Sequence, residues 1–272
     1  MNVNAVSSVE FIPAASNRIS PLPLKKSIFF FALPSIGFRL AIYNGMPLLL
    51  SWGLTQFEAF IVSFTVPSAI LLALAVGFFK QEGHPVTWAG MCARFRLRRL
   101  SRRDWLWIAG GFLFAFLAGG MMQVAAQKLI AALPAIAPPD FFPPLLDPRV
   151  TLSAAVFTDF VGSPVQGNWS VFILYAVALF FNIAGEELWW RGYILPRQEA
   201  AHGRWTWLIH GLMWLLFHVP FYPWAIVSLI PSCLTIAFIS QRRQNTTSAV
   251  VIHSLYNGLP LIFILAMVMG LI

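Results

Sequence analysis

The sequence predicts an all-α fold, a polytopic transmembrane helix bundle of about seven spans with a cavity inside the membrane. Hydrophobic residues make up 58% of the 272 residues and charged residues only 10%, a composition typical of integral membrane proteins. The apolar residues gather in runs long enough to cross a bilayer, and lysines and arginines gather between the runs. Together these patterns indicate a membrane bundle rather than a soluble domain with an anchor.

Seven apolar runs are candidate spans, and they lie at about 28–53, 57–79, 104–130, 169–196, 205–220, 222–240 and 248–271. The run that ends at Pro220 measures only roughly 24 Å at about 1.5 Å per residue, against about 30 Å of hydrocarbon. We therefore expect it to cross incompletely. Pro220 and Pro223 would end its helix beside His218, and irregular backbone at that depth requires surrounding protein or a water-filled cavity.

The net charge of +8 falls mainly in loops that lie on one side of this topology. The basic loop residues are Lys25, Lys26, Lys80, Arg94, Arg96, Arg98, Arg99, Arg102, Arg103, Arg242 and Arg243. Such loops are typically cytoplasmic, so we expect the N-terminus inside and the proline-rich connection of about 132–168 outside. The sequence thus predicts a flexible cytoplasmic tail at 1–27 and a single membrane domain at 28–272.

The basic loops also bear on partners. Clustered arginines attract anionic lipid head groups, so membrane lipids are expected partners. A nucleic-acid partner is not predicted, because the basic loop contains no recognition module.

Three charges lie inside an otherwise apolar run, in the segment GEELWWRG at residues 185–192. Charges at such a depth are costly and indicate a functional site. On a helix, Glu187 and Arg191 are one turn apart and can pair, whereas Glu186 is rotated by about 100° and faces elsewhere. One glutamate can therefore be structural while the other is free. The alternative is that all three form a salt-bridge cluster at the helix end.

Two later runs carry further polar residues. The segment WLLFH ends at His218, and HSLYN places His253 and Asn257 on one helix face. A carboxylate and a histidine can activate water, and a histidine with an amide can stabilise an oxyanion. A single membrane histidine more often bonds a neighbouring helix. His210 could face the same pocket, and Arg39 is either structural or a partner for a substrate carboxylate.

These motifs, in this order, resemble those of the CPBP family of intramembrane proteases. That family includes the CAAX prenyl endopeptidases of the Ras-converting type and bacteriocin-processing or self-immunity proteins. The motif EExxxR is matched by Glu186, Glu187 and Arg191, FxxxH at His218 with Trp214 replacing phenylalanine, and HxxxN by His253 and Asn257. The family-like catalytic core would lie at about 169–271.

The resemblance implies an enzyme, an intramembrane endopeptidase that cleaves a membrane-associated peptide or protein, either prenylated or of leader type. In this reading Glu186 and His218 activate water, His253 and Asn257 form the oxyanion hole, Glu187 and Arg191 brace the helix, and Trp214 reshapes the cavity wall. The setting would be a bacterial or archaeal cell membrane. We expect the cavity to open to the cytoplasmic side.

The sequence leaves the cofactor open between none and Zn²⁺. Glu186, His218 and His253 could ligate zinc in a site with an open position, but the sequence contains no HExxH segment, which favours metal-free hydrolysis. Two other hypotheses remain. A non-enzymatic bacteriocin-immunity or membrane scaffold protein would use the polar residues for packing, and a transporter would use them as an ion path, although no internal repeat supports a transporter.

Overall fold

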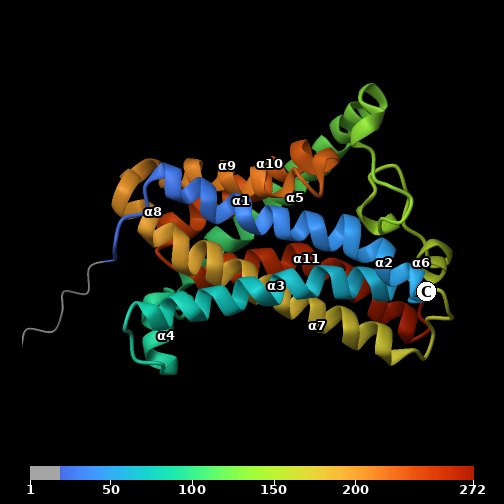
Figure 1. Ribbon diagram of the computed structural model, residues 1–272, viewed down its shortest axis with the longest axis horizontal. Coiled ribbons are helices and arrows are strands. Elements are labelled where there is room, and N and C mark those ends of the chain that lie inside the picture. Colours follow the sequence, from blue (N-terminus) through green and yellow to red (C-terminus); the bar gives the residue numbers. More distant parts are fainter. Residues whose placement is uncertain (1–18) are drawn as a thin grey trace, which may run out of the picture.

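The computed structural model describes residues 19–272, and every regular element in that range is helical (Figure 1). Residues 1–18, most of the predicted cytoplasmic tail, lie outside the described residues. Six helical stretches are long and apolar enough to cross a membrane, and the prediction of an all-α membrane bundle is confirmed. They are Leu24–Ser51, Gln56–Gln81, Arg102–Ala132, Trp169–His218, Pro223–Arg243 and Thr246–Val268.

The fourth stretch combines two of the seven predicted runs. α7 (Trp169–Glu186) continues through the π-helix η4 (Glu187–Ile194) into α8 (Leu195–His202), and a turn at η5 (Gly203–Trp205) leads to α9 (Thr206–His218). α9 has only 13 residues, or about 20 Å, which is shorter than the hydrocarbon core of about 30 Å. The helix ends at His218, as the prolines that follow it predicted.

Some of the remaining long helices begin at side-chain caps. The full set is α1 (Leu24–Leu40), continued by η1 (Ala41–Gly45) and α2 (Met46–Ser51), then α3 (Gln56–Gln81), α5 (Arg102–Ala132), α10 (Ile226–Arg243) and α11 (Thr246–Val268). Thr55 starts α3 and Ser101 starts α5, each with a reciprocal capping box. Such a box satisfies backbone N–H groups that a helix start leaves without partners.

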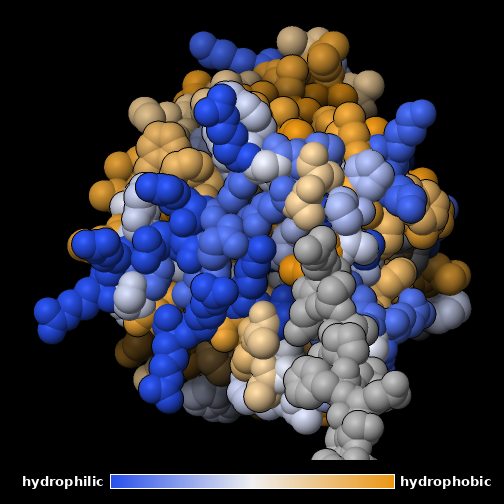
Figure 2. Space-filling model, turned by 90° about the vertical axis from the view of Figure 1, so that its left-hand side faces the viewer, coloured by the Kyte–Doolittle hydropathy of each residue, from blue (hydrophilic) through white to orange (hydrophobic). Residues whose placement is uncertain are grey.

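The two ends of the bundle differ in charge. α4 (Trp88–Arg94) and α8 lie at one end, and α6 (Ala154–Val161) lies with the C-terminus at the other (Figure 1). We call these the basic end and the loop end. Figure 2 looks onto the basic end, where hydrophilic side chains gather. Three ion pairs hold carboxylates there, namely Arg94–Glu82, Arg96–Glu199 and Arg243–Asp104. Exposed arginines such as Arg98 and Arg102 remain as excess positive charge.

Glycines allow the helices around the polar residues to pack closely. At Gly185 in α7, a Cβ atom would collide with the Ser68 carbonyl oxygen of α3. At Gly211 in α9, a Cβ atom would lie 2.8 Å from Leu234 Cδ2 of α10. In lipid, helices associate through close contacts of this kind because apolar surface alone gives no net attraction. α7 is thereby fixed against α3, and α9 against α10.

Two boundaries differ from the predictions. The first helix begins at Leu24 rather than near 28, because Pro23 precedes it as the N-cap and the polar Lys25 and Lys26 lie inside its first turn. The outer connection is not wholly irregular, since it contains α6. The Ser153 side chain caps that helix, and Gly162 ends it in the left-handed conformation at φ 77°. A helix of 8 residues leaves too few turns for a periodic signal in the sequence.

The arrangement of the ends gives a testable topology. Because basic residues favour the cytoplasmic side, we expect the basic end to face the cytoplasm and the C-terminus to face the opposite side. A cytoplasm-active reporter fused after Lys80 should be active, and the same reporter fused after Ile272 should be inactive. An export-active reporter should give the reverse pattern, and two fusions on the same side would contradict this topology.

Candidate active site

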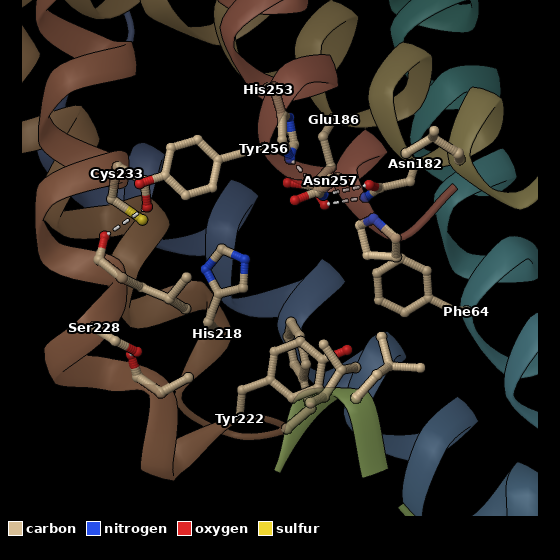
Figure 3. A pocket seen from close by; sticks show the side chains of 18 of the residues that line it. Phe64, Asn182, Glu186, His218, Tyr222, Ser228, Cys233, His253, Tyr256 and Asn257 are labelled. Atoms are coloured by element: carbon tan, nitrogen blue, oxygen red, sulfur yellow. Dashed lines mark hydrogen bonds between the residues drawn. The ribbon is translucent and has the colours of Figure 1, made fainter. Parts of the chain in front are cut away.

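A cavity of about 350 Å³ lies between α3, α5, α7, α9, α10 and α11. Glu186, His218, His253 and Asn257 all line it (Figure 3), and so does Trp214. The sequence places these residues on three separate runs, and the tertiary structure brings them around one space. Combined action on a single bound molecule is therefore geometrically possible.

The cavity extends from these residues toward the loop end. Leu146 and Pro148 of the outer connection line it, and Trp224 Nε1 donates to the Leu146 carbonyl oxygen at 3.0 Å, which holds the connection over the cavity. Trp214 also lines the cavity, and its ring contacts the fully buried Arg191.

Glu186 is almost fully buried, yet both of its oxygens have hydrogen-bond donors. Oε1 accepts from Asn182 Nδ2 at 2.7 Å, and Oε2 accepts from Trp214 Nε1 at 2.9 Å. Such bonds stabilise an ionised carboxylate away from bulk water. Asn182 is not part of the three sequence motifs. The signal was an asparagine one helical turn before Glu186 in an apolar run, a spacing that puts both on one helix face.

A chain of hydrogen bonds connects the two adjacent glutamates. Glu187 Oε1 accepts from His253 Nδ1 at 2.7 Å, and His253 Nε2 accepts from Asn257 Nδ2 at 3.0 Å. Asn257 Nδ2 also donates to Asn182 Oδ1 at 2.8 Å. Asn182 then donates to Glu186. This network fixes the tautomer of His253 with its proton on Nδ1 and ties α11 to α7.

His218 presents its two ring nitrogens to different surroundings. Its Nδ1 lies 2.7 Å from the Trp214 carbonyl oxygen. Because a carbonyl oxygen only accepts, Nδ1 carries the proton and Nε2 keeps a free lone pair. The rings of Phe217, Phe221 and Tyr222 surround the imidazole at centroid distances of 4.9, 5.5 and 6.4 Å. His218 is thus held in a tautomer that can accept a proton at Nε2.

Trp214 contacts four other polar side chains of the site, namely Glu186, Arg191, His218 and His253. In addition to the hydrogen bond to Glu186, its ring lies 3.5 Å from Arg191 Cζ, in a cation–π contact. The ring centroids of His218 and His253 each lie 5.5 Å from that of Trp214. Phenylalanine has no N–H group and could not make the bond to Glu186. The sequence suggested only that Trp214 reshapes the cavity wall. In the structure it also bonds Glu186 and contacts Arg191.

Glu187 and Arg191 form the ion pair that their spacing predicted. Glu187 Oε1 lies 3.1 Å from Arg191 Nη1 in η4, and both side chains are 0% exposed. The same oxygen accepts the hydrogen bond from His253. One buried carboxylate thus holds a cation of its own helical segment and an imidazole of α11. Both residues lie outside the cavity lining, a geometry that fits a bracing role.

The residues in place do not fit a zinc site. Zinc requires ligand lone pairs that converge on one point, but both nitrogens of His253 are already hydrogen-bonded, to Glu187 and to Asn257. Within residues 19–272, no group of three His, Cys, Asp or Glu side chains could hold a metal ion. The zinc set of Glu186, His218 and His253 would need a rearrangement of this network.

Two residues singled out in the sequence lie outside the cavity. His210 is fully buried, and its Nδ1 lies 2.7 Å from Gln198 Oε1 of α8, so the expectation that it could face the pocket is wrong. Arg39 lies on α1, where its Nη1 donates to the Pro220 carbonyl oxygen at 3.1 Å.

Comparison with known proteins gives one family. The family model described as type II CAAX prenyl endopeptidase Rce1-like matches residues 168–259. This segment contains all three motifs, and the match confirms the resemblance to CPBP intramembrane proteases. It covers about a third of the chain, and α1, α3 and α5 lie outside it. No curated protein and no solved structure matches the chain. The family match supports a CAAX-type intramembrane endopeptidase in general.

The buried ion pair generates a prediction about stability. Arg191→Ala would leave Glu187 without its cation, and breaking a buried pair costs about 3–5 kcal/mol. We expect a lower yield of folded protein and a lower midpoint of thermal unfolding in detergent. Arg204→Ala removes an exposed arginine and should unfold like the wild type. An Arg191→Ala protein of normal stability and lost activity would instead place Arg191 in the chemistry.

Proposed function

We propose that the protein is an intramembrane endopeptidase that hydrolyses a peptide bond of a membrane-associated substrate. The proposal rests mainly on one observation, that Glu186 of α7 and His218 of α9 line the same cavity (Figure 3). A carboxylate and an imidazole lone pair are the proton acceptors that hydrolysis requires. An immunity or scaffold protein that used these residues only for packing would need no cavity between them.

The proposed reaction begins with a water molecule between Glu186 and His218. These residues take a proton from the water as its oxygen attacks the carbonyl carbon of the scissile bond, and the carbonyl becomes a tetrahedral oxyanion. When the oxyanion collapses, the C–N bond breaks and the stored proton passes to the leaving amine. The N–H donors of Asn182 and Trp214 hold the Glu186 carboxylate in place during this cycle.

The oxyanion is assigned to His253 and Asn257. In the resting arrangement both hydrogens of Asn257 Nδ2 are used, one toward Asn182 and one toward His253. The assignment therefore requires the amide to release one of these bonds, or a second proton to reach His253 Nε2. Glu187, bonded to His253 Nδ1, would balance that positive charge. Donors aimed at a developing oxyanion stabilise the transition state more than the substrate.

A groove on the lipid-facing side supports a membrane-associated substrate. It is lined by Phe116, Leu117, Gly119, Gly120, Gln123, Ser228, Leu229, Ser232 and Tyr256. Gln123, Ser228, Leu229, Ser232 and Tyr256 also line the cavity. A peptide held in the bilayer, prenylated or of leader type, could thus reach the cavity between α5, α10 and α11 without first entering water.

Substitution of the two proposed proton acceptors tests the activity. Glu186→Gln keeps the shape of the side chain but removes its basicity, and we expect turnover to fall by about 10² to 10⁴ while substrate still binds. His218→Ala should have an effect of similar size. The measurement is single-turnover cleavage of a membrane-embedded peptide by purified protein in lipid. Glu58→Gln, at the start of α3 and outside the cavity, is the control. Near-wild-type cleavage by Glu186→Gln would overturn the proposal.

Trp214→Phe tests the hydrogen bond to Glu186 separately from packing. The variant keeps an aromatic ring but has no N–H group, so Oε2 of Glu186 loses its donor. A hydrogen bond to a charged group contributes about 1.5–3 kcal/mol, and we expect turnover to fall by about tenfold or more with normal folding. Trp189→Phe is the matched control, because Trp189 is buried and its Nε1 makes no hydrogen bond. Equal turnover in the two variants would show that the bond has no catalytic effect.

A further inference from the structure

The helix that bears His218 is too short to cross a bilayer, so we expect the carbonyl groups at its end to lie within the membrane region. α9 stops at His218, and Pro220 follows with no N–H group to continue the hydrogen-bond ladder. Backbone N–H groups of the turn after α9 bond to some of the last carbonyl groups of the helix. Val219 donates to the Leu216 carbonyl oxygen at 3.2 Å, and Tyr222 donates to that of His218 at 2.7 Å. These bonds leave the carbonyls of Phe217, Pro220 and Phe221 in need of other donors.

Three side chains of the first membrane stretch supply those donors. Ser35 Oγ donates to the Phe217 carbonyl oxygen at 2.6 Å, and Arg39 Nη1 donates to that of Pro220 at 3.1 Å. Tyr43 Oη completes the set at 3.5 Å from the Phe221 carbonyl oxygen. The three donors are spaced four residues apart, so they lie on one face of the helix. All three bond the same short turn after His218, which is a more specific arrangement than ordinary helix packing.

Arg39 is the central member of this stripe. It lies about 22 Å along the helix from Leu24, inside a run of apolar residues where a charge is costly. Its Cζ is 3.3 Å from the ring centroid of Tyr43, which shields one face of the guanidinium. A cation at the C-terminal end of α9 also lies where the helix dipole favours positive charge. A specific bond to the end of α9 accounts for an arginine at this position.

The turn that these donors hold also surrounds the imidazole of His218. The rings of Phe217, Phe221 and Tyr222 contact it, and Phe221 and Tyr222 line the cavity. Phe38, on the same helix as Arg39, packs against Phe217 and Phe221 at centroid distances of 5.3 Å each. A shift of the turn backbone would therefore shift the imidazole together with one wall of the cavity.

We infer that Ser35, Arg39 and Tyr43 form a clamp that positions His218 by satisfying the carbonyl groups at the end of α9. These are positioning residues, because none of them lines the cavity. The clamp lies on the first membrane stretch, outside the segment that the family model matches. Its effect on catalysis rests on the function proposed above, whereas its effect on the backbone does not.

The first test measures the backbone and needs no enzymatic activity. The variants are Ser35→Ala, Tyr43→Phe, Arg39→Met and the double variant Ser35→Ala/Arg39→Met, with Arg39→Lys as the conservative change. Hydrogen–deuterium exchange is followed by mass spectrometry in lipid nanodiscs for the peptide that contains the amides of Val219, Phe221 and Tyr222. We expect exchange there to accelerate by about tenfold in the double variant, to a smaller extent in the single variants, and little in Arg39→Lys.

Two controls separate a local effect from general loosening. Leu40→Ala removes a large exposed side chain next to Arg39 and should leave the exchange of this peptide unchanged. A peptide from α7 serves as the internal reference in every variant. Unchanged exchange at the turn in the double variant would overturn the clamp, and so would equal acceleration in α7. If the double variant fails to fold, Ser35→Ala and Tyr43→Phe, each of which removes one hydroxyl group, test the same bonds.

The second test measures turnover and apparent substrate affinity separately. Loss of the clamp should lower kcat by about 10- to 100-fold with little change in KM, because a small displacement of a reacting group mainly affects the chemical step. Arg39→Lys should recover most of the turnover, and Leu40→Ala should match the wild type. A raised KM with unchanged kcat would instead make Arg39 a substrate-binding residue and overturn the inference. An inactive wild-type protein would count against the proposed function, and the exchange result would still decide whether the clamp exists.

Discussion

Trp214 interacts with a carboxylate and a guanidinium at the same time, and the arrangement of the site depends on this. Its indole N–H lies in the ring plane and donates to Glu186, while the ring face stacks against Arg191. An aromatic ring is positive at its edge and negative on its face, so one side chain can stabilise both charges. Glu186 and Arg191 can then remain buried near each other without a direct ion pair. The carboxylate keeps lone pairs for the cavity, and the cation remains with Glu187.

The two adjacent glutamates have different roles because their side chains point in different directions. Glu186 is the last residue of α7 and lines the cavity, whereas Glu187 is the first residue of η4 and points into the protein. Glu187 compensates Arg191 and fixes the tautomer of His253. Asn182, Asn257 and His253 connect the two carboxylates. Asn257 donates to both Asn182 and His253, Asn182 donates to Glu186, and His253 donates to Glu187. A change at either glutamate should therefore affect the other, since a continuous chain of hydrogen bonds joins them.

The short helix α9 places an imidazole inside the membrane region at the cost of exposed carbonyl groups. A helix that ended at His218 without hydrogen-bond partners would leave polar backbone in an apolar setting. Side chains of the first membrane stretch resolve this conflict by donating to the carbonyl groups at the end of α9. Ser35 and Arg39 bond the turn after His218, and Trp224 holds the connection at Leu146. Segments far apart in the sequence thus support one catalytic candidate.

The sequence by itself determined the helical membrane fold and the candidates for chemistry. Apolar runs give spans, and the prolines after His218 predicted where α9 ends, because both effects act within a few residues of the chain. The pairing of Glu187 with Arg191 and the contact of His253 with Asn257 also followed from spacing, since residues one helical turn apart must be neighbours. The family model confirmed the resemblance that these motifs indicated.

Only the tertiary structure decided which groups come together around the cavity. Asn182 and the N–H group of Trp214 gained their roles from the distance between α7, α9 and α11, and no spacing along the chain reports that distance. His210 and His218 look alike in the sequence, yet one is bonded to Gln198 and the other lines the cavity. Arg39 likewise had two possible roles until its partner, a carbonyl group on a different helix, was known. Local spacing fixes neighbours on one helix, whereas contacts between helices depend on how complete helices pack.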